Sequence, residues 1–381
     1  MLDVIVVGGG PVGTYLGGLL AQAGLNFAVL DRRGWPAEHS RAIGIHPRAL
    51  RGFDRLGLTS QLLAAGVTIR RGLLLGGGGQ VLGELGFETA DEQHPYVLSL
   101  PQVETERLLA ARLEALAPGR LRRSVRVQAV QPAGDHVRVM LERDGLTETW
   151  PARYVVAADG WRSGVRRAAG ISFPGSVYPD KYLMGDFPDT TPFGTQAMIS
   201  LTAAGVTECF PLPSGQRRWV VHTGTQLLDA AGPDALTHII QERTGLPVPA
   251  GECRMFSAFE VRRHLAGRMW QGRLCLIGDA AHVVSPIGGQ GMNLGWLDAD
   301  ALAPLLIRAV QQGGVPQIQW QGWERQRRRS AWIAARQAEA NMAAGRPAST
   351  ATQHVREALL TQLLRPPAAG LLADAFTMRW L

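Results

Sequence analysis

The chain has 381 residues, of which 46% are hydrophobic and 19% charged, as is usual for a globular protein with a large core. This length exceeds one average domain and predicts either one large domain or two intertwined ones. The formal net charge of +7 comes almost entirely from arginine, since Lys181 is the only lysine. The arginines are scattered and no basic run is interleaved with aromatic residues, so we expect no nucleic-acid binding.

Membrane and redox signals point to a cytoplasmic protein. The sequence contains no apolar run of about 18 residues, so no transmembrane segment is expected. The first ten residues, MLDVIVVGGG, predict a buried strand rather than a signal peptide. Cys209, Cys253 and Cys275 lie far apart, without a CxxC motif or histidines at metal spacing. They predict free thiols and no metal site, and the oligomeric state is left open.

The first chemical motif stands at the start of the chain. Residues 2–7, LDVIVV, predict a buried strand, and GGGPVG follows with Gly8, Gly10 and Gly13 in GxGxxG register. Gly8 permits a tight turn, Gly10 lets a pyrophosphate approach the backbone, and Gly13 allows close packing of helix and strand. A second strand, FAVL, ends at Asp31, which is placed to accept a ribose hydroxyl and selects against a 2′-phosphate. This order of elements predicts the adenosine of FAD or NAD.

A second strand–loop–helix unit stands far downstream and favours FAD. Leu274–Ile277 predicts a buried strand that ends at the acid Asp279, and PIGGQGMN then opens a helix expected over Leu294–Gln312. Two such units suit a long, extended cofactor. Asp279 could accept a hydroxyl of the ribityl chain, and the second helix N-terminus could stabilise negative charge on the reduced flavin pyrimidine.

Other patterns predict the rest of the fold. Residues 72–87 predict a hairpin, residues 181–223 an antiparallel sheet, and the segment beyond 316 helices that break at Pro366–Pro367. His46 is expected to cap a helix that has Pro47 at its first position. His282 is expected to support the neighbouring loop rather than act as a base.

Five segments together resemble the class A flavoprotein monooxygenases, the aromatic hydroxylases built like p-hydroxybenzoate hydroxylase. The resemblance runs in chain order from residue 2 to about residue 340. Its segments are GGGPVG (8–13), SRAIGIHPR (40–48), LPQVETERLL (100–109), AADGWRSGVR (157–166) and GDAAHVVSPIGGQGMN (278–293).

The resemblance implies an α/β fold in which a Rossmann-like FAD-binding domain of the GR2 type is interleaved with an antiparallel-sheet substrate domain. The FAD-binding domain would comprise residues 1–70, 100–175 and 265–345. Residues 71–99 and 176–264 would form the substrate domain, and residues 346–381 a C-terminal helical tail.

The resemblance also implies the cofactor site. Arg41 matches the arginine near the pyrophosphate, Asp159 and Gly160 match a DG motif linked to FAD and NAD(P)H, and Asp279 matches the ribityl-binding acid. The full set of expected cofactor residues is Gly8, Gly10, Pro11, Val12, Gly13, Asp31, Arg32, Arg41, Gln102, Val127, Asp159, Gly160, Asp279, Pro286, Gly288, Gly289, Gly291, Met292 and Asn293.

The implied reaction is hydroxylation of an aromatic substrate, phenolic or polyketide-like, through a flavin C4a-hydroperoxide, with O2 and NADH or NADPH as co-substrates. Pro286 is the candidate catalytic element, because its rigid φ would fix a backbone carbonyl near the peroxide. The candidate substrate residues are Tyr182, Met184, Phe210, Arg218 and His222.

Three alternatives remain open on the same fold. A flavin halogenase is disfavoured because no WxWxIP segment is present. A membrane-associated epoxidase or quinone-type hydroxylase, or a prenyl reductase, is harder to separate because the C-terminal segment is fairly apolar. A non-catalytic FAD-binding protein is the third alternative, and NAD(P)H consumption stimulated by a substrate would distinguish it from an enzyme.

Overall fold

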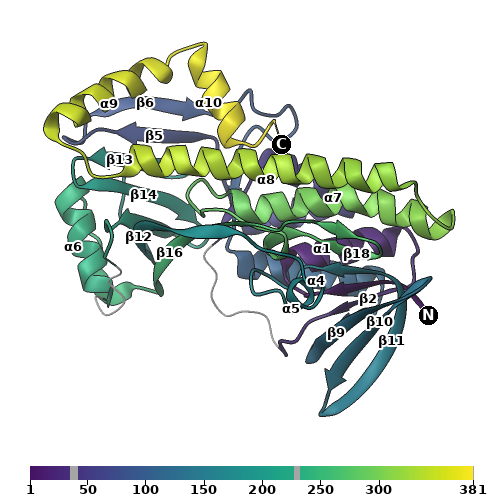
Figure 1. Ribbon diagram of the computed structural model, residues 1–381. Coiled ribbons are helices and arrows are strands. Elements are labelled where there is room, and N and C mark those ends of the chain that lie inside the picture. Colours follow the sequence, from purple (N-terminus) through teal and green to yellow (C-terminus); the bar gives the residue numbers. More distant parts are fainter. Residues whose placement is uncertain (35–41, 227–231, 381) are drawn as a thin grey trace.

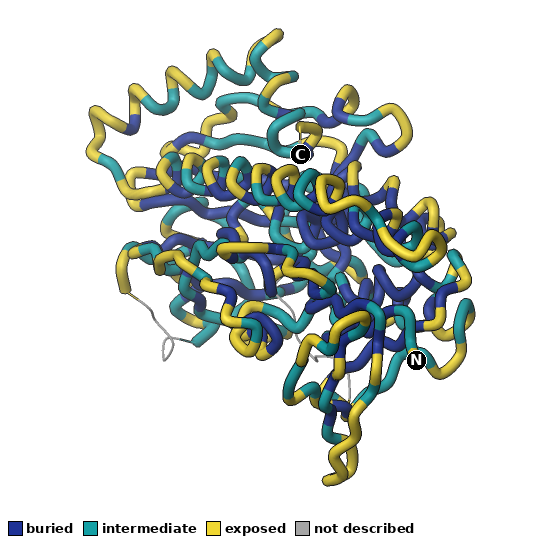
Figure 2. The backbone as a smooth tube through the Cα atoms, turned by 45° about the vertical axis from the view of Figure 1, so that its right-hand side comes forward, coloured by how far each residue is buried: buried dark blue, intermediate teal, exposed yellow. Residues whose placement is uncertain are grey.

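The computed structural model describes residues 1–34, 42–226 and 232–380. Two large sheets lie side by side, and the long helix α8 (Gln317–Gly345) runs across both of them (Figure 1). The central strands and α7 (Gln290–Gln311) are mostly buried, whereas the C-terminal helices are mostly exposed or half-buried (Figure 2). The architecture is the mixed α/β fold with C-terminal helices that the sequence predicts.

The first sheet carries the N-terminal motif on a parallel centre. The strand LDVIVV pairs in parallel with a strand on each side, as expected for a run that is apolar throughout. The strand order is β17 (Trp270–Gln271), β18 (Leu274–Leu276), β11 (Leu146–Ala157), β1 (Leu2–Val7), β2 (Phe27–Leu30) and β8 (Leu121–Arg122), with β10 (His136–Arg143) and β9 (Val125–Ala133) extending antiparallel from β11.

Helices cover this sheet and bury its apolar face. The first helix, α1 (Pro11–Gln22), packs against both α4 (Gln102–Leu116) and α7. Phe53 and Trp296 meet edge to face at 4.8 Å inside this core, which also holds the strand residues of β1. The smaller helices on this side are α2 (Pro47–Leu56), α3 (Thr59–Ala65) and α5 (Gly164–Ala168).

The second sheet is antiparallel except for one pair, and it has two differently covered faces. Its order is β19 (His282–Val283), β16 (Met255–Leu265), β12 (Gly175–Pro188), β15 (Gln216–His222), β14 (Gly205–Leu212), β13 (Ala197–Thr202), β5 (Arg71–Leu75) and β6 (Val81–Gly86). One face packs Leu183, Trp219 and Val221 against helix α6 (Gly232–Thr244). The other face packs Val206, Val220 and Phe259 with Met342 of α8. The second face is the one that lines the site described below.

The chain end folds onto this second sheet. Helices α9 (Thr350–Leu363) and α10 (Ala368–Phe376) contact β6 of the β5–β6 hairpin, and the expected break at Pro366–Pro367 lies between them. Figure 1 shows both helices lying over the hairpin. The hairpin and the helical tail, although far apart in sequence, therefore pack together and form one continuous unit. A small third sheet joins β3 (Gly44–Ile45), β7 (Val97–Ser99) and β4 (Val67–Ile69) at the junction of the two halves.

One expected helix start and one expected side-chain role differ in the structure. Helix α7 begins at Gln290 rather than Leu294, because the left-handed Gly289 (φ 68°) ends the glycine turn and the chain enters the helix at once. His46 does precede α2 with Pro47 at the first helical position, but its side chain makes no capping hydrogen bond. The imidazole is turned instead toward the cavity at the centre of the molecule.

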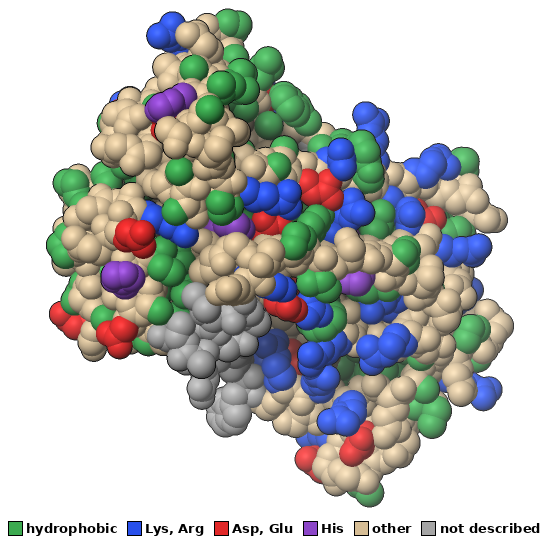
Figure 3. Space-filling view, turned by 60° about the vertical axis from the view of Figure 1, so that its left-hand side comes forward, with side chains coloured by type: hydrophobic (Ala, Val, Ile, Leu, Met, Phe, Trp, Pro, Cys, Tyr) green, Lys and Arg blue, Asp and Glu red, His purple; other side chains and the backbone are tan. Residues whose placement is uncertain are grey.

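Charged side chains show no single basic stripe on the face in Figure 3, where arginine and lysine are spread over the right-hand part of the view. In the described part of the chain, no helix is both long and apolar enough to span a bilayer. Among the same residues, no group of three or more histidine, cysteine or acidic side chains is arranged to hold a metal.

Candidate active site

A large cavity of about 1300 Å³ runs between the two sheets. It begins at the turn after β1, passes the loop before α7, and ends against the second face of the antiparallel sheet. The residues expected to bind the cofactor that line it are Gly8, Gly10, Pro11, Val12, Asp31, Arg32, Gln102, Val127, Asp159, Gly160, Asp279, Pro286, Gly288, Gly289, Gly291 and Met292. Arg41 lies outside the described residues, and its role stays a prediction.

Glycine is required at two points of the first turn. Gly8 has a φ of 110°, and a Cβ there would stand 2.3 Å from the carbonyl oxygen of Ala158. A Cβ on Gly13 would stand 1.9 Å from the carbonyl oxygen of Gly8, so Gly13 lies under the turn rather than on the cavity wall. Helix α1 therefore starts close against the strand ends, with Gly10, Pro11 and Val12 on the cavity wall.

Asp31 is buried at the end of β2 and braces this turn. Its carboxylate accepts the backbone N–H of Gly9 at 3.1 Å and the backbone N–H of Arg33 at 2.9 Å. The Arg33 guanidinium also bonds Asp31 at 3.0 Å and lies 3.7 Å from Glu106, which in turn accepts from the Gln102 amide at 2.7 Å. The sequence analysis missed Arg33 and Glu106, although Arg33 stands two residues after the expected acid. Together they place two carboxylates and one guanidinium at this end of the cavity.

The two carboxylate oxygens of Asp159, in the DG segment, differ in their hydrogen bonding. Its Oδ2 accepts the backbone N–H groups of Gly164 at 2.9 Å and Val165 at 3.3 Å. Its Oδ1 is buried and has no hydrogen-bond partner among the described residues. A buried acceptor without a partner costs free energy, so a group that donates to it from the cavity would stabilise the site.

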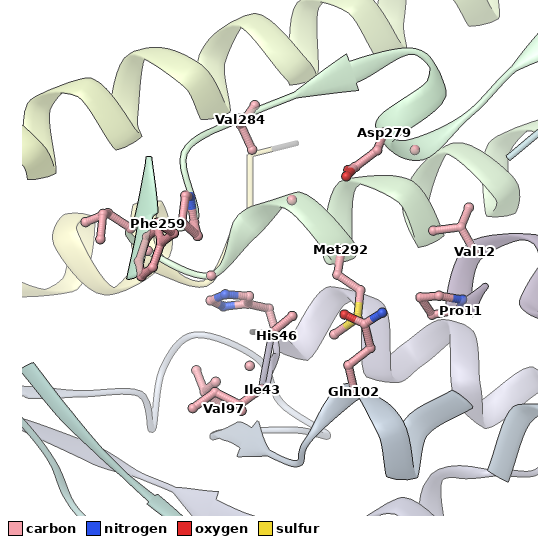
Figure 4. A pocket seen from close by; sticks show the side chains of 18 of the residues that line it. Pro11, Val12, Ile43, His46, Val97, Gln102, Phe259, Asp279, Val284 and Met292 are labelled. Carbon is pink, nitrogen blue, oxygen red and sulfur yellow. The ribbon is translucent and has the colours of Figure 1, made fainter. Parts of the chain in front are cut away.

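Asp279 extends into the cavity from the end of β18. Figure 4 shows Asp279 and Gln102 approaching the cavity from opposite sides, with Met292 between them. The surrounding protein raises the pKa of the Asp279 carboxyl by desolvation, and the nearby His282 partly offsets this.

A buried ion cluster fixes the backbone around Asp279. Asp298 of α7 accepts the Gly278 N–H at 3.0 Å, contacts His282 Nε2 at 2.6 Å, and accepts from Arg327 Nε at 2.8 Å. His282 is buried against this carboxylate and is not on the cavity wall. Its position agrees with the expected supporting role.

The loop between β19 and α7 forms the next stretch of wall. Gly288 (φ 101°) and Gly289 (φ 68°) both have left-handed backbone, which an L side chain rarely adopts. Asn293 does not line the cavity. Its amide donates to the carbonyl oxygens of Gly44 (2.9 Å) and Gly289 (2.8 Å), and its oxygen accepts the His46 N–H (2.9 Å).

His46 is a cavity residue that the sequence analysis treated only as a cap. Its ring is buried beside the backbone of Gly288 and Gly289. Burial lowers the pKa of His46 to about 4, so the ring is neutral at physiological pH. The ring lies edge-on to Phe376 of α10 at 5.6 Å, which connects this wall to the C-terminal helices.

The expected substrate residues separate into two groups. Met184, Phe210 and Arg218 line the cavity, and Arg218 forms a two-bonded ion pair with Asp186 at 2.6 and 2.7 Å. Tyr182 and His222 are not on the cavity wall. Tyr182 packs on Phe259 with ring centroids 5.5 Å apart, and His222 Nε2 lies 3.2 Å from Asp180. Their predicted contact with substrate is therefore not supported by this geometry.

Two further parts of the wall were not anticipated. Glu208 stands on β14 beside Phe210, and the two-residue spacing that placed Phe210 on this face also applies to Glu208. The C-terminal helices contribute the apolar residues Leu360, Leu364, Leu372, Ala375 and Phe376. No motif marks these helical positions, because any apolar residue of suitable size can fill them.

Comparison with known proteins identifies the cofactor. A family model described as an FAD binding domain matches residues 1–338. The chain belongs to this FAD-binding family. FAD is accordingly its cofactor, and the tight glycine turn, the unpartnered Asp159 oxygen and the acid at Asp279 fit that molecule.

Curated flavoprotein relatives are monooxygenases. The chain is 35% identical to a rifampicin monooxygenase of Streptomyces venezuelae over 78% of this chain and 62% of the relative. It is 33% identical to a 6-methylpretetramide 4-monooxygenase of Streptomyces rimosus over 81% of this chain and 56% of the relative. The chain thus spans about three fifths of the length of these proteins. The epoxidase, prenyl-reductase and non-catalytic alternatives gain no support from the comparisons.

A solved flavoprotein structure has the same fold over nearly the whole chain. The p-nitrophenol 4-monooxygenase of Pseudomonas putida DLL-E4 superposes with a TM-score of 0.90 and covers 99% of this chain and 98% of its own. Its sequence identity of 23% limits that comparison to the fold.

Proposed function

We propose that the protein is an FAD-dependent, NAD(P)H-driven monooxygenase that hydroxylates an aromatic substrate, phenolic or polyketide-like. The observation that carries the proposal is one continuous cavity, which joins the glycine turn, Asp279 and the loop before α7 to an apolar sheet face. The names of the curated relatives support a monooxygenase reaction. The assignment of individual residues and the division into two interleaved domains are part of this proposal.

The cofactor half of the cavity would hold and orient FAD. The N-terminus of α1 binds the pyrophosphate through backbone N–H groups, with Gly8 and Gly13 keeping that approach open. Asp31 and Glu106 are the acceptors for the adenosine ribose, and Asp279 is the acceptor for a ribityl hydroxyl. Bound FAD, once reduced by NAD(P)H, supplies the chemistry that activates O2 and delivers one oxygen atom.

The loop of Pro286–Gly289 and the first turn of α7 would form the reactive end of the site. The N-terminal turn of a helix carries unpaired N–H groups and a partial positive charge, so α7 stabilises an anionic ring placed against it. Neutral His46 fills the opposite wall without adding a second charge. Asn293 keeps the loop, α7 and the segment before α2 in register.

The sheet half would hold the substrate in a dry environment. Its wall is mainly apolar, with Met184, Phe210 and Phe259 from the sheet and Phe376 from α10. Such a wall excludes water, which protects a reactive oxygen donor from wasteful breakdown. Arg218 is held by Asp186, and this ion pair lies at the edge of this space.

We also propose that the reduced nicotinamide binds only transiently and that the protein works in the cytoplasm. Cys209, Cys253 and Cys275 are free thiols in the structure, as a reducing compartment favours.

Anaerobic mixing of the FAD-loaded protein with NADH or NADPH tests the function. The flavin absorbance should bleach much faster with one member of a phenol and polyketide panel present, and aerobic turnover should then yield the hydroxylated product. No flavin reduction by either nucleotide, with any compound, would contradict the proposal.

A further inference from the structure

Glu208 is an ionisable group set in the apolar wall of the substrate half. It is 9% exposed, and its neighbours across the sheet are Ile199 of β13 and Val220 of β15. On its own strand, Val206 and Phe210 share its face and also line the cavity. Within the described part of the chain, the Glu208 carboxylate has no hydrogen-bond or ion-pair partner. A carboxyl in such a setting is costly unless a ligand satisfies it.

The residues around Glu208 do not supply a positive charge that pairs with its carboxylate. The ionisable residues nearby on the sheet include Arg218 of the adjacent strand β15, which is already paired with Asp186, and Tyr182 of β12, one strand further away. The Tyr182 hydroxyl is buried without a partner, and burial, followed by the charges of Glu208 and Asp180, raises its pKa. From α8, the polar residues on the wall are the uncharged Gln337 and Asn341. Burial accordingly raises the pKa of Glu208 to about 7.

Glu208 also lies near the reactive end of the cavity. Ile287 of the loop before α7 belongs to the same buried cluster as Val206 and Val220, of which Val206 lies on the same strand as Glu208 and Val220 lies opposite it on β15. An aromatic substrate ring placed between the sheet and this loop would thus present one edge to Glu208 and another edge to the part of the cavity proposed to hold the flavin.

We propose that Glu208 is a specificity-determining residue, which accepts a hydrogen bond from an aromatic hydroxyl and so selects uncharged hydroxyaromatic substrates over aromatic carboxylates. This inference rests on the proposed function. A carboxylate acceptor gives a charge-assisted hydrogen bond, which is stronger than one between neutral groups. The same bond draws the hydroxyl proton toward Glu208 and makes the ring more electron-rich, as oxygen transfer to a ring requires. An aromatic carboxylate would instead meet a like charge in a low-dielectric space.

Calorimetric binding to the FAD-loaded protein tests this with three probes that share one ring system. 2-Naphthol carries the hydroxyl donor, 2-methoxynaphthalene lacks it, and 2-naphthoate carries a negative charge. We expect 2-naphthol to bind roughly tenfold more tightly than either other probe at about pH 8, as loss of a hydrogen bond to a charged group predicts. Its affinity should rise between about pH 6 and about pH 8, where phenols stay protonated.

The variant Glu208→Gln keeps the side-chain shape and removes the charge. It should lose roughly tenfold in 2-naphthol affinity and the pH dependence, bind 2-methoxynaphthalene as before, and bind 2-naphthoate more tightly. Glu208→Asp should keep a weaker, still pH-dependent preference for 2-naphthol. The matched control is Glu92→Gln, the same change at an exposed position, which should leave all three affinities unchanged.

Wild-type binding of 2-naphthol no tighter than 2-methoxynaphthalene, including no detectable binding of either, would overturn the proposal for Glu208. The same holds if Glu208→Gln retains the wild-type affinities and pH profile. These outcomes are separate from a failure of the proposed function. A protein that binds 2-naphthol through Glu208 but never oxidises NAD(P)H would refute the monooxygenase reaction while the binding role stands.

Discussion

The side-chain oxygen of Asn293 accepts the backbone N–H of His46 at 2.9 Å, across a sequence separation of 247 residues. The same amide donates to the carbonyl oxygens of Gly44 and Gly289. One buried side chain thus joins the start of α7 to the segment before α2, and it holds both walls of the reactive end in place. This relationship explains why a residue that does not line the cavity can control what the cavity binds.

Asn293→Ala should therefore weaken FAD binding without removing any cavity contact. It leaves one buried N–H and two buried carbonyl groups without this partner, at a cost of about 1–3 kcal/mol each when no water replaces it. We expect at least a tenfold rise in the dissociation constant of FAD, measured by titration of apoprotein. Asn341→Ala, which removes an amide that does line the cavity on α8, should affect FAD less. Unchanged FAD affinity in Asn293→Ala would contradict the supporting role.

Gly13→Ala should abolish retention of FAD during purification. The new Cβ would lie 1.9 Å from the Gly8 carbonyl oxygen, so either the turn or the start of α1 must move. The flavin absorbance per protein should fall by roughly tenfold or more, as a loss of at least about 1.4 kcal/mol predicts. Gly322→Ala, near the start of α8 with open space around it, is the control and should stabilise the fold by about 0.5–1 kcal/mol. Equal flavin content in the two variants would refute the turn assignment.

Asp279→Ala should reduce FAD affinity through loss of the ribityl acceptor. Loss of one hydrogen bond to a charged group costs about 1.5–3 kcal/mol, or roughly ten- to a hundredfold in affinity. Asp135→Ala, at an exposed turn between β9 and β10, controls for the loss of one negative charge. Fluorescence titration of the two apoproteins separates the effects, and wild-type affinity in Asp279→Ala would remove this residue from the cofactor site.

Glu208 should make the stability of the fold depend on pH. Its pKa is raised to about 7 in the folded chain, above the ordinary value of 4.5, so the folded state holds its proton more tightly than the unfolded state. The stability contributed by Glu208 is therefore highest below about pH 4.5, falls as pH rises to about 7, and is constant above that, a total loss of about 3 kcal/mol.

Urea unfolding of wild type and Glu208→Gln at about pH 5 and about pH 8 measures this loss. The free energy of unfolding of the wild type should fall relative to the variant as pH rises. If the free energies of unfolding of the two proteins differ by the same amount at both pH values, the pKa of Glu208 is not raised by folding, and the prediction is wrong.

The sequence predicts the cofactor half of this site better than the substrate half, for a physical reason. Binding a pyrophosphate or a flavin edge needs bare backbone, left-handed glycines and strand-end acids, and these leave patterns such as Gly8–Gly13 and Gly288–Gly291. The substrate wall only needs side chains of suitable size on one face of a sheet. Alternation predicts the sheet face of Met184 and Phe210, which both line the cavity, but it does not show that Tyr182 packs against Phe259 and His222 instead.

The contribution of the chain end was not predictable from local pattern. Phe376 stacks on Phe87 at 5.6 Å and closes the cavity over the β5–β6 hairpin, a contact between segments separated by most of the chain. The apolar residues of helices such as α9 and α10 indicate that each helix packs on an apolar surface, but they do not identify that surface. Glu208, by contrast, carried a usable signal, since it shares the alternation that identified Phe210.

The most direct test of the account is turnover of an aromatic hydroxyl compound by the FAD-loaded protein with NAD(P)H under isotopically heavy O2, followed by mass spectrometry of the product. The account predicts a product that carries one heavy oxygen atom, formed only when FAD and reduced nicotinamide are both present. Product without heavy oxygen, or NAD(P)H oxidation that yields only hydrogen peroxide with every compound of the panel, would contradict it.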